Sequence, residues 1–359
     1  MASAAEPLHA STLWTSYSLK REKADVAGLP PKRRRVGTTL ANIDNALSGG
    51  LDYGQISCIS SPPEARASDL VLAILASHLL SDPDATATVI DSTLAFDIRR
   101  LYGILVRRVQ TQGHDVAGVM KALDRLKIMK VFDFTGMTEA VSEVRDELED
   151  GRRRPQARTD AAPSVQLSPK GTISDSEGEE EETLEIETPP QASARLATEH
   201  ELTRARSTML VINSISQLTI PLLKSNHSQA QSLLTSTLHS IGHLTIAHDL
   251  CTLLINGTQL WGASNQAKED SPSIFSTCTL RPALGQNLGH LFDLHLLVHE
   301  VPRTAESART VYGGGAVPIG GRRVELGNVV EVLQDRYGGR VGRWSGFTSA
   351  SDGRLLTCM

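Results

Sequence analysis

The sequence predicts an α/β protein with a mostly parallel, twisted sheet that is flanked by helices. Short apolar strands alternate with amphipathic helices between residues 55 and 149. The alternation resumes with a buried strand over Ser207–Ser214, a long helix over about Ser228–Asp249 and a strand over Cys251–Asn256. Alternation of this kind builds parallel sheets with helices on both faces. Glycine-rich turns after Thr279 predict shorter antiparallel strands that complete the sheet.

The first elements lie between Gly37 and Asp69. An amphipathic helix and a Gly-Gly break precede an apolar strand over Gln55–Ser60, which a tight loop joins to a helix that begins near Ser68. Strand, tight loop and helix N-terminus is an arrangement that binds phosphate, because free backbone N–H groups and the positive helix end point at the loop.

The loop retains little of the phosphate-binding pattern G-x-x-x-x-G-K-[ST]. The eight aligned residues are Ser61, Pro62, Pro63, Glu64, Ala65, Arg66, Ala67 and Ser68. Only the terminal hydroxyl survives, and Ala67 stands where a lysine would reach the phosphates. Glu64 adds a negative charge beside the anion. We therefore interpret the loop as a vestigial nucleotide-binding site. The plainer alternative is a strand–turn–helix that never bound phosphate.

The elements that follow continue the alternation. The helix from Ser68 has apolar residues at i, i+3, i+4 and i+7 and leads to a strand over Ala87–Asp91. A helix over Arg99–Val109, a strand over Leu126–Phe134 and a helix over Thr138–Leu148 come next, the last with Thr138 as its predicted N-cap.

Composition is that of a protein with a large core. The chain has 359 residues, of which 40% are hydrophobic. This length allows two domains, and a single large α/β domain with tails fits as well. No apolar run approaches the ~18–20 residues that span a bilayer, and we expect no signal peptide and no membrane contact. The four cysteines show no C-x-x-C spacing, which is typical of reduced thiols inside a cell and predicts no metal site.

Composition also predicts five segments. Residues 1–36 form a polar tail, residues 37–149 and 207–348 form the two parts of the core, residues 150–206 form a disordered acidic insertion, and residues 349–359 form a C-terminal tail. The N-terminal tail ends in Lys32, Arg33, Arg34 and Arg35, which we interpret as a nuclear import signal. A solvated arm that contacts phosphates is the alternative.

The charge of the chain is unevenly distributed. Residues 171–190 carry eight acidic residues and no Lys or Arg, so that without them the net charge of −5 becomes +3. A mildly basic folded part is compatible with a nucleic-acid partner.

Five motifs, taken in order, resemble those of the eukaryotic RecA-type recombinases and their paralogues. They are similar to the lead-in to the phosphate loop, the strand that supplies the catalytic glutamate, the strand that supplies the magnesium-shell aspartate, the P-A-L-G signature after the second DNA-binding loop, and the closing strands. In this sequence they are Thr39–Ile56, Ile90–Ser92, Leu210–Ser214, Arg281–Gly285 and Asp335–Trp344. The D-type paralogue resembles the chain most, through residues 122–134 and Pro221-Leu222-Leu223.

The resemblance implies a RecA-like P-loop NTPase core and assigns three positions their family roles. Ala67 replaces the phosphate-loop lysine, Thr93 the catalytic glutamate, and Asn213 the aspartate of the magnesium shell. Phosphoryl transfer depends on positioning and electrostatics, and all three positions have lost their charge. We therefore expect no ATP hydrolysis and no cofactor, with residual binding of ATP and Mg²⁺ as the alternative. Asn256 and Gln259 are former γ-phosphate sensors or residues that hydrogen-bond at a strand end.

Four residues are candidate DNA contacts. Trp261 lies where the family's second DNA-binding loop starts and would stack on bases, although a packing role explains it as well. Lys268 is the only base between Trp261 and Thr279, and Lys224 and Arg281 would contact phosphates or simply face solvent. His239 and His243 have the i, i+4 spacing of a metal pair, but a third ligand is missing, so we predict no metal site.

These observations predict a non-catalytic RecA-like subunit of a recombination mediator complex. It would assist recombinase filament assembly on single-stranded DNA during homologous-recombination repair in the nucleus. Its expected partners are other RecA-type recombinase paralogues, the recombinase itself, and single-stranded DNA, directly or through the complex. One alternative is a DNA-stimulated ATPase in which Arg66 replaces the missing lysine. Another is a RecA-fold subunit of the Elongator tRNA-modification complex, against which the P-A-L-G signature and the import cluster stand.

Overall fold

The computed structural model describes residues 34–111, 117–159, 207–260, 273–284, 286–312, 324–350 and 353–358. Within them, ten strands form one sheet in the order β12-β11-β10-β9-β3-β7-β6-β4-β5, with β8 paired to β7 at its end. The strands are β3 (Gln55–Ser61), β4 (Thr86–Asp91), β5 (Leu126–Lys130), β6 (Thr208–Asn213), β7 (Cys251–Leu260), β8 (Leu280–Pro282), β9 (Leu294–Pro302), β10 (Leu326–Asp335), β11 (Trp344–Ser349) and β12 (Leu355–Thr357).

The sheet is parallel in its first half and antiparallel in its second. β5, β4, β6, β7, β3 and β9 pair in parallel, whereas β10, β11 and β12 are added to β9 as antiparallel strands. The predicted mixed α/β architecture with antiparallel strands at the C-terminal end is therefore confirmed.

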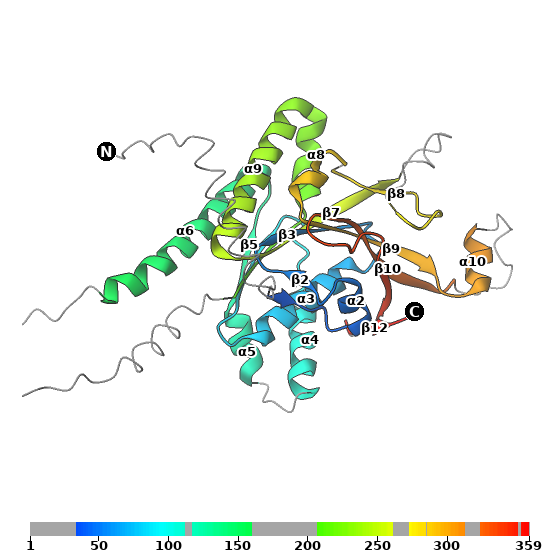
Figure 1. Cartoon of the computed structure of the whole chain (residues 1–359), viewed down its shortest axis with the longest axis horizontal. Coiled ribbons are helices and arrows are strands. Elements are labelled where there is room, and N and C mark those ends of the chain that lie inside the picture. Colours follow the sequence, from blue (N-terminus) through cyan, green and yellow to red (C-terminus); the bar gives the residue numbers. More distant parts are fainter. Residues whose placement is uncertain are drawn as a thin grey trace, which may run out of the picture.

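Helices cover both faces of this sheet (Figure 1). The helices α2 (Ala41–Ala46), α3 (Ala67–Ser81), α4 (Ile98–Thr111) and α5 (Ala117–Asp124) pack on one face, and α6 (Phe134–Thr159), α8 (Ile215–Ser225) and α9 (His227–His248) pack on the other. Alternate residues of a strand point to opposite faces. In β6, Met209 and Val211 accordingly join the first core, and Leu210 and Ile212 join the second.

Two short elements complete the chain outside these layers. The helix α10 (Ala305–Tyr312) follows β9, and the 3₁₀ helix η2 (Gln286–Leu291) precedes it. A two-stranded sheet pairs β1 (Arg35–Val36) with β2 (Leu51–Asp52). None of the described helices is both long and apolar enough to cross a membrane.

The predicted strand over Leu126–Phe134 and helix over Thr138–Leu148 need correction. The strand ends at Lys130, and α6 begins at Phe134. Asp133 causes the early start: its carboxylate accepts a hydrogen bond from the Gly136 N–H at 2.7 Å, as an N-cap does. Thr138 is not the cap, since its hydroxyl donates to the Thr135 carbonyl within the helix.

Segment ends also differ from the predicted ones. The helix α6 continues to Thr159, ten residues beyond the predicted core boundary at 149. β1 lies within the predicted N-terminal tail, and β12 lies within the predicted C-terminal tail, where it pairs with β11. Short strands of two or three residues carry too little periodicity to be read from sequence. The predicted disorder of the acidic insertion concerns residues 160–206, which lie outside the described residues.

Candidate nucleotide site

The loop after β3 sits where a phosphate loop would sit, but its backbone is engaged within the protein. Pro62 and Pro63 have no N–H to offer. The Ala65 N–H donates to the Pro62 carbonyl at 3.2 Å, and the Ala67 N–H donates to the Ala65 carbonyl at 2.8 Å. The Arg66 N–H donates to Asn328 Oδ1 on β10 at 3.2 Å. Phosphate loops hold their anion with such N–H groups, so these residues form a closed turn instead.

The side chains of the loop reinforce this closure. Ala67, in the lysine position, is 2% exposed and belongs to the core below the loop. Glu64 and Arg66 are exposed. Burial raises the pKa of Glu300 on β9, the negative charge of Glu64 raises it further, and the positive charge of Arg66 lowers it. The Arg66 guanidinium thus lies in the field of two carboxylates, which already offset part of its charge.

The carboxyl ends of β4 and β6 bring together two of the predicted site residues, Thr93 and Asn213, whose hydroxyl and amide are 3.3 Å apart. Asp91, which was not predicted to be a site residue, is the direct neighbour of Asn213 across the strand pair. Asp91 is 1% exposed, and its Oδ1 accepts hydrogen bonds from the Asn213 amide at 3.0 Å and the Thr93 hydroxyl at 2.7 Å. The backbone N–H groups of Thr93 and Phe96 donate to the same carboxylate at 3.1 Å.

This cluster has the features of a structural element. Four donors converge on one buried carboxylate, which therefore has few lone pairs left for a metal or a water molecule. Thr93 and Asn213 supply a hydroxyl and an amide where the resemblance expects two carboxylates. In the part of the chain that the structure describes, no group of three or more His, Cys, Asp or Glu side chains could hold a metal ion.

A buried polar chain links the central strands below the loop. The Asn256 amide on β7 donates to the Ser60 hydroxyl on β3 at 3.0 Å, and that hydroxyl is hydrogen-bonded to His295 Nε2 on β9 at 2.8 Å. Burial lowers the pKa of His295 to about 4, so the imidazole is neutral at pH 7. Asn256, a predicted former γ-phosphate sensor, thus hydrogen-bonds between strands, as the alternative interpretation expected. Gln259 is exposed on the same strand.

The predicted DNA contacts are dispersed. Lys224 is exposed in the last turn of α8, whereas Arg281 on β8 is only 8% exposed and does not face solvent. Trp261 and Lys268 lie outside the described residues. The exposed His239 and His243 remain an isolated pair on α9.

Two residues of the predicted import cluster contact the folded core. Arg34 pairs with Asp249 at 2.9 Å and lies over the Tyr53 ring at 4.6 Å, and Arg35 pairs with Asp52 at 2.6 Å. Lys32 and Arg33 lie outside the described residues.

The sequence interpretation missed the role of Asn328. This residue closes the loop after β3 from a strand more than 250 residues away, and nothing in the local pattern around it signals that contact.

Comparison with known proteins supports the fold. No family model matches the sequence, and no curated protein matches it. Among solved structures, the chain is similar to the RadB recombinase, with a TM-score of 0.51 and 14% sequence identity over 89% of this chain and 98% of that one. The chain therefore has the fold of a RecA-type recombinase, including the sheet whose phosphate-loop corner is closed here.

Proposed function

We propose that this chain is a non-catalytic, RecA-like subunit of a recombination mediator complex. It acts in the nucleus, where it assists assembly of the recombinase filament on single-stranded DNA during homologous-recombination repair. Its partners are other RecA-type recombinase paralogues and the recombinase. The D-type paralogue is the relative that its motifs resemble most.

One observation carries the proposal, namely a recombinase-type fold whose phosphate loop is sealed by its own hydrogen bonds. The Arg66 N–H is held by Asn328 Oδ1, and Ala67 is packed in the core. Catalysis of phosphoryl transfer needs a phosphate clamp, a metal and a positioned water molecule. A chain that keeps the architecture without these groups retains the surfaces by which the fold assembles, and the proposed role uses those surfaces.

The sheet offers one such surface at its outer strand. β5 pairs with β4 and has no second neighbour among the described strands, so its other edge presents backbone donors and acceptors. An open groove of mixed character runs beside it, and the Phe132 side chain in it is 79% exposed. Its lining combines apolar residues with charged ones such as Lys130, Glu139 and Glu143. Exposed sheet edges accept an added strand from a partner. We assign partner docking to this edge.

Affinity capture from nuclease-treated nuclear extract tests the proposal. The full-length tagged chain is expected to retain RecA-type recombinase paralogues, and the purified chain is expected to show no ATP binding by isothermal titration calorimetry. Capture of tRNA-modification subunits alone would move the chain to the Elongator alternative. Capture of no RecA-type protein would overturn the proposal.

The ATPase alternative depends on one exposed side chain, Arg66. If Arg66 replaced the missing lysine, the purified chain would hydrolyse ATP in the presence of single-stranded DNA, and Arg66→Ala would abolish the activity. Under the proposed function both proteins show the same background rate. Arg99→Ala, which removes an exposed arginine from α4, is the matched control.

A further inference from the structure

The loop between β10 and β11 lies at the opposite end of the central strands from the closed phosphate loop (Figure 1). The Arg336 N–H donates to the Asp293 carbonyl at 2.8 Å, and the Asp293 carboxylate accepts from the N–H of Ile56, near the start of β3, at 2.8 Å. At the other end of the loop, Arg343 donates to the Ser48 hydroxyl at 3.1 Å. The loop thus covers the amino-terminal ends of the parallel strands β3 and β9.

Arginine and tyrosine side chains of this loop point outward. Arg336 has a side chain that is 54% exposed, and Tyr337 is 58% exposed. The Arg336 guanidinium lies 5.7 Å from the centre of the Tyr337 ring, and its Nη1 lies 3.8 Å from Asp293 Oδ1. Arg343 is exposed as well, and no carboxylate among the described residues is within ion-pair distance of it.

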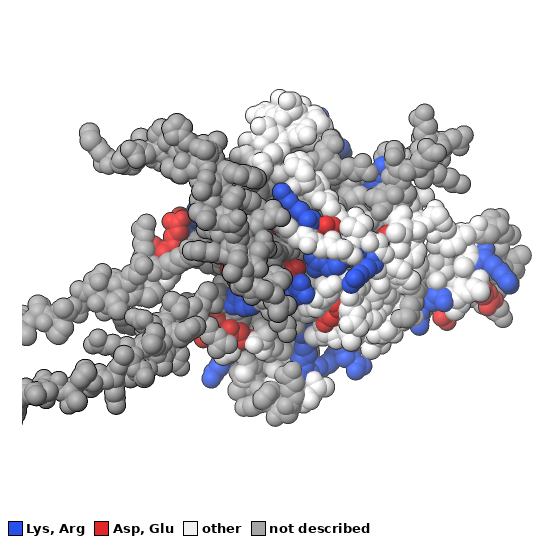
Figure 2. Space-filling model, in the orientation of Figure 1, with Lys and Arg blue, Asp and Glu red and all other residues white. Residues whose placement is uncertain are grey.

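Positive charge dominates the solvent side of this surface. Arg34 and Arg35 extend it, with side chains that are 42% and 36% exposed. Among the described carboxylates that pair with Arg34, Arg35 and Arg336, Asp249 is well exposed, at 51%, whereas the side chain of Asp293 is 14% exposed and that of Asp52 is 3% exposed. Figure 2 shows more blue than red in this central part of the face. Charges that face solvent act on a polyanion more strongly than buried, paired ones.

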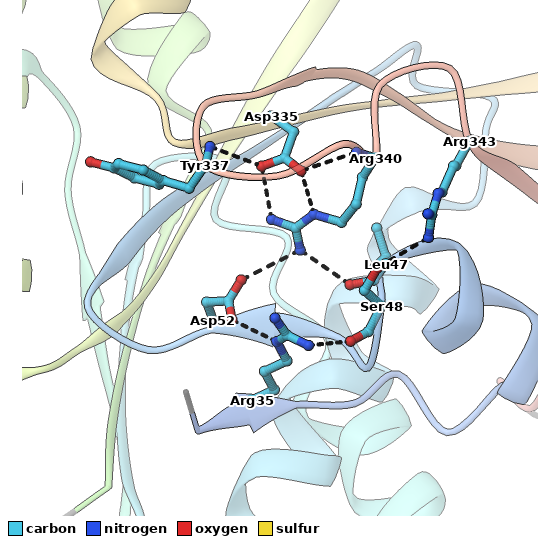
Figure 3. A network of polar contacts seen from close by, with 8 residues as sticks. All are labelled: Arg35, Leu47, Ser48, Asp52, Asp335, Tyr337, Arg340 and Arg343. Atoms are coloured by element: carbon cyan, nitrogen blue, oxygen red, sulfur yellow. Dashed lines mark hydrogen bonds and ion pairs between the residues drawn. The ribbon is translucent and has the colours of Figure 1, made fainter. Parts of the chain in front are cut away.

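A buried arginine fixes the loop in one conformation (Figure 3). Arg340 donates to both carboxylate oxygens of Asp335, at 2.7 and 3.0 Å, and reaches Asp52 at 3.4 Å and the Leu47 carbonyl at 3.1 Å. At Gly338 a Cβ atom would lie 2.5 Å from Asp335 Oδ2, so a larger residue would displace the carboxylate that Arg340 holds. The outward side chains are therefore presented by a preorganised loop, which lowers the entropy cost of binding.

From this arrangement we infer that the β10–β11 loop binds single-stranded DNA, with Arg336 and Arg343 on the phosphates and the Tyr337 ring stacked on a base. Cationic side chains beside an exposed aromatic ring are the combination that binds single strands without sequence preference. An acidic protein segment would use the guanidinium groups but would gain nothing specific from the ring. The inference rests on the proposed function for the choice of DNA, and it gives the chain a direct DNA contact.

Fluorescence anisotropy with the full-length chain and a labelled oligothymidylate of about 20 nucleotides tests this site. The charge variant is Arg336→Ala with Arg343→Ala. Arg309→Ala with Arg303→Ala is the control, since both residues are exposed beyond the far end of the nine-residue strand β9, roughly 30 Å from the loop. Removing one arginine that neutralises a phosphate lowers the slope of log affinity against log salt by about 0.7. The slope should therefore fall by about 1.4 in the charge variant and stay unchanged in the control.

The ring is tested separately. Tyr337→Ala is expected to weaken binding about 5- to 150-fold with an unchanged salt slope, and Tyr337→Phe, which keeps the ring, is expected to bind as the original chain does. Equal binding by the charge variant and its control, or by Tyr337→Ala and the original chain, would overturn the site. So would full displacement of the DNA by a poly-glutamate peptide of equal charge. DNA binding without capture of any RecA-type protein would instead overturn the proposed function and leave the site standing.

Discussion

At position 67 a lysine would enter the core beneath the loop and not the space above it. Ala67 is 2% exposed and packs in the same core as Leu70 and Val71. The replaced lysine therefore cannot be restored by one substitution, because the loop above it has closed as well.

Ala67→Lys is expected to restore no ATP binding and to lower the free energy of unfolding by about 1–3 kcal/mol, since it buries a charge at a positive helix end. Urea denaturation and calorimetric titration with ATP measure the two effects. Ser68→Lys at the neighbouring exposed position is the control and should change stability by less than about 0.5 kcal/mol. Micromolar ATP binding by Ala67→Lys would contradict the closed-loop interpretation.

A second effect at the residue scale comes from two buried histidines. Burial lowers the pKa of both His78 and His295 to about 4. Both rings are hydrogen-bonded in their neutral form: His78 lies 2.8 Å from the Tyr53 hydroxyl and 2.8 Å from the Thr86 carbonyl. Unfolding returns each ring to a pKa near 6.5, so the unfolded chain binds more protons between about pH 6.5 and 4.

Stability should therefore fall as the pH drops through this range. From pH 7 to 5 each histidine accounts for a loss of about 2 kcal/mol in the free energy of unfolding. His78→Gln removes one titrating group, so between pH 7 and 5 its free energy of unfolding should fall by about 2 kcal/mol less than that of the original chain. His243→Gln, on the exposed face of α9, should lose as much as the original chain does. Urea midpoints at the two pH values give the comparison, and equal losses for all three proteins would refute it.

At the scale of elements, long apolar runs were predictable and their junctions were not. The strand Gln55–Ser61 and the helix His227–His248 lie within one residue of their predicted ends. The start of α6 depends on a single Asp133 side chain, and β12 is stable as a strand only because β11 lies beside it. Local patterns determine what an element buries, but tertiary contacts determine where a short element begins.

In the candidate site, too, local patterns identified the residues but not the tertiary contacts that they make. Alignment to the phosphate-loop pattern located residues 61–68, and the family resemblance identified Thr93 and Asn213, whose side chains are 3.3 Å apart in the structure. The contact that closes the loop, from Asn328 on β10, and the contact below it, from His295 on β9 to Ser60, come from strands far along the chain. No local spacing encodes them, so sequence alone could show that the site had lost its charges but not that it was sealed.

Arg340 joins two elements that are distant in sequence, the β10–β11 loop and the turn before β2. The hydrogen bonds that Arg340 donates to Asp335, and the charges of Asp335 and Asp52, raise the pKa of Arg340 against the effect of burial. Burial alone would raise the pKa of Asp335, but hydrogen bonds from Arg340 outweigh it and lower this pKa overall. The pair is thus ionised and mutually dependent.

Arg340→Ala leaves the buried Asp335 carboxylate without its cation, while Asp52 keeps Arg35, and is expected to cost about 3–5 kcal/mol in the free energy of unfolding. Arg336→Ala, an exposed arginine of the same loop, should cost less than about 0.5 kcal/mol. Thermal and urea unfolding compare the two variants with the original chain. Similar stability of both variants would show that the buried network does not hold the loop.

At the scale of the whole molecule, the proposed partner, the closed loop and the DNA site occupy three separate places. The closed loop lies at the carboxyl end of β3, the arginine loop lies at the amino-terminal ends of β3 and β9, and β5 ends the sheet. Parallel strands separate the first two by their own length, and the order of strands separates β5 from both. A chain arranged in this way can contact DNA and a partner without using a nucleotide.

The exposed edge gives this arrangement its most direct test. Phe132, 79% exposed beside β5, is expected to be an anchor of the partner interface, since a few apolar or aromatic residues carry most of the energy of such interfaces. Phe132→Asp should reduce capture of RecA-type partners at least about tenfold, which corresponds to the removal of one strong anchor. Its melting temperature should not change, because the side chain contributes little to the core.

Ile246→Asp provides the matched control, since Ile246 is 74% exposed on α9 and the same charge is introduced on another face. Quantitative mass spectrometry of the captured proteins compares the two variants. If Phe132→Asp and Ile246→Asp retain equal amounts of RecA-type partners, the partner does not dock at β5. The docking surface would then have to lie elsewhere on the sheet. The proposed DNA site on the β10–β11 loop would be unaffected by this result.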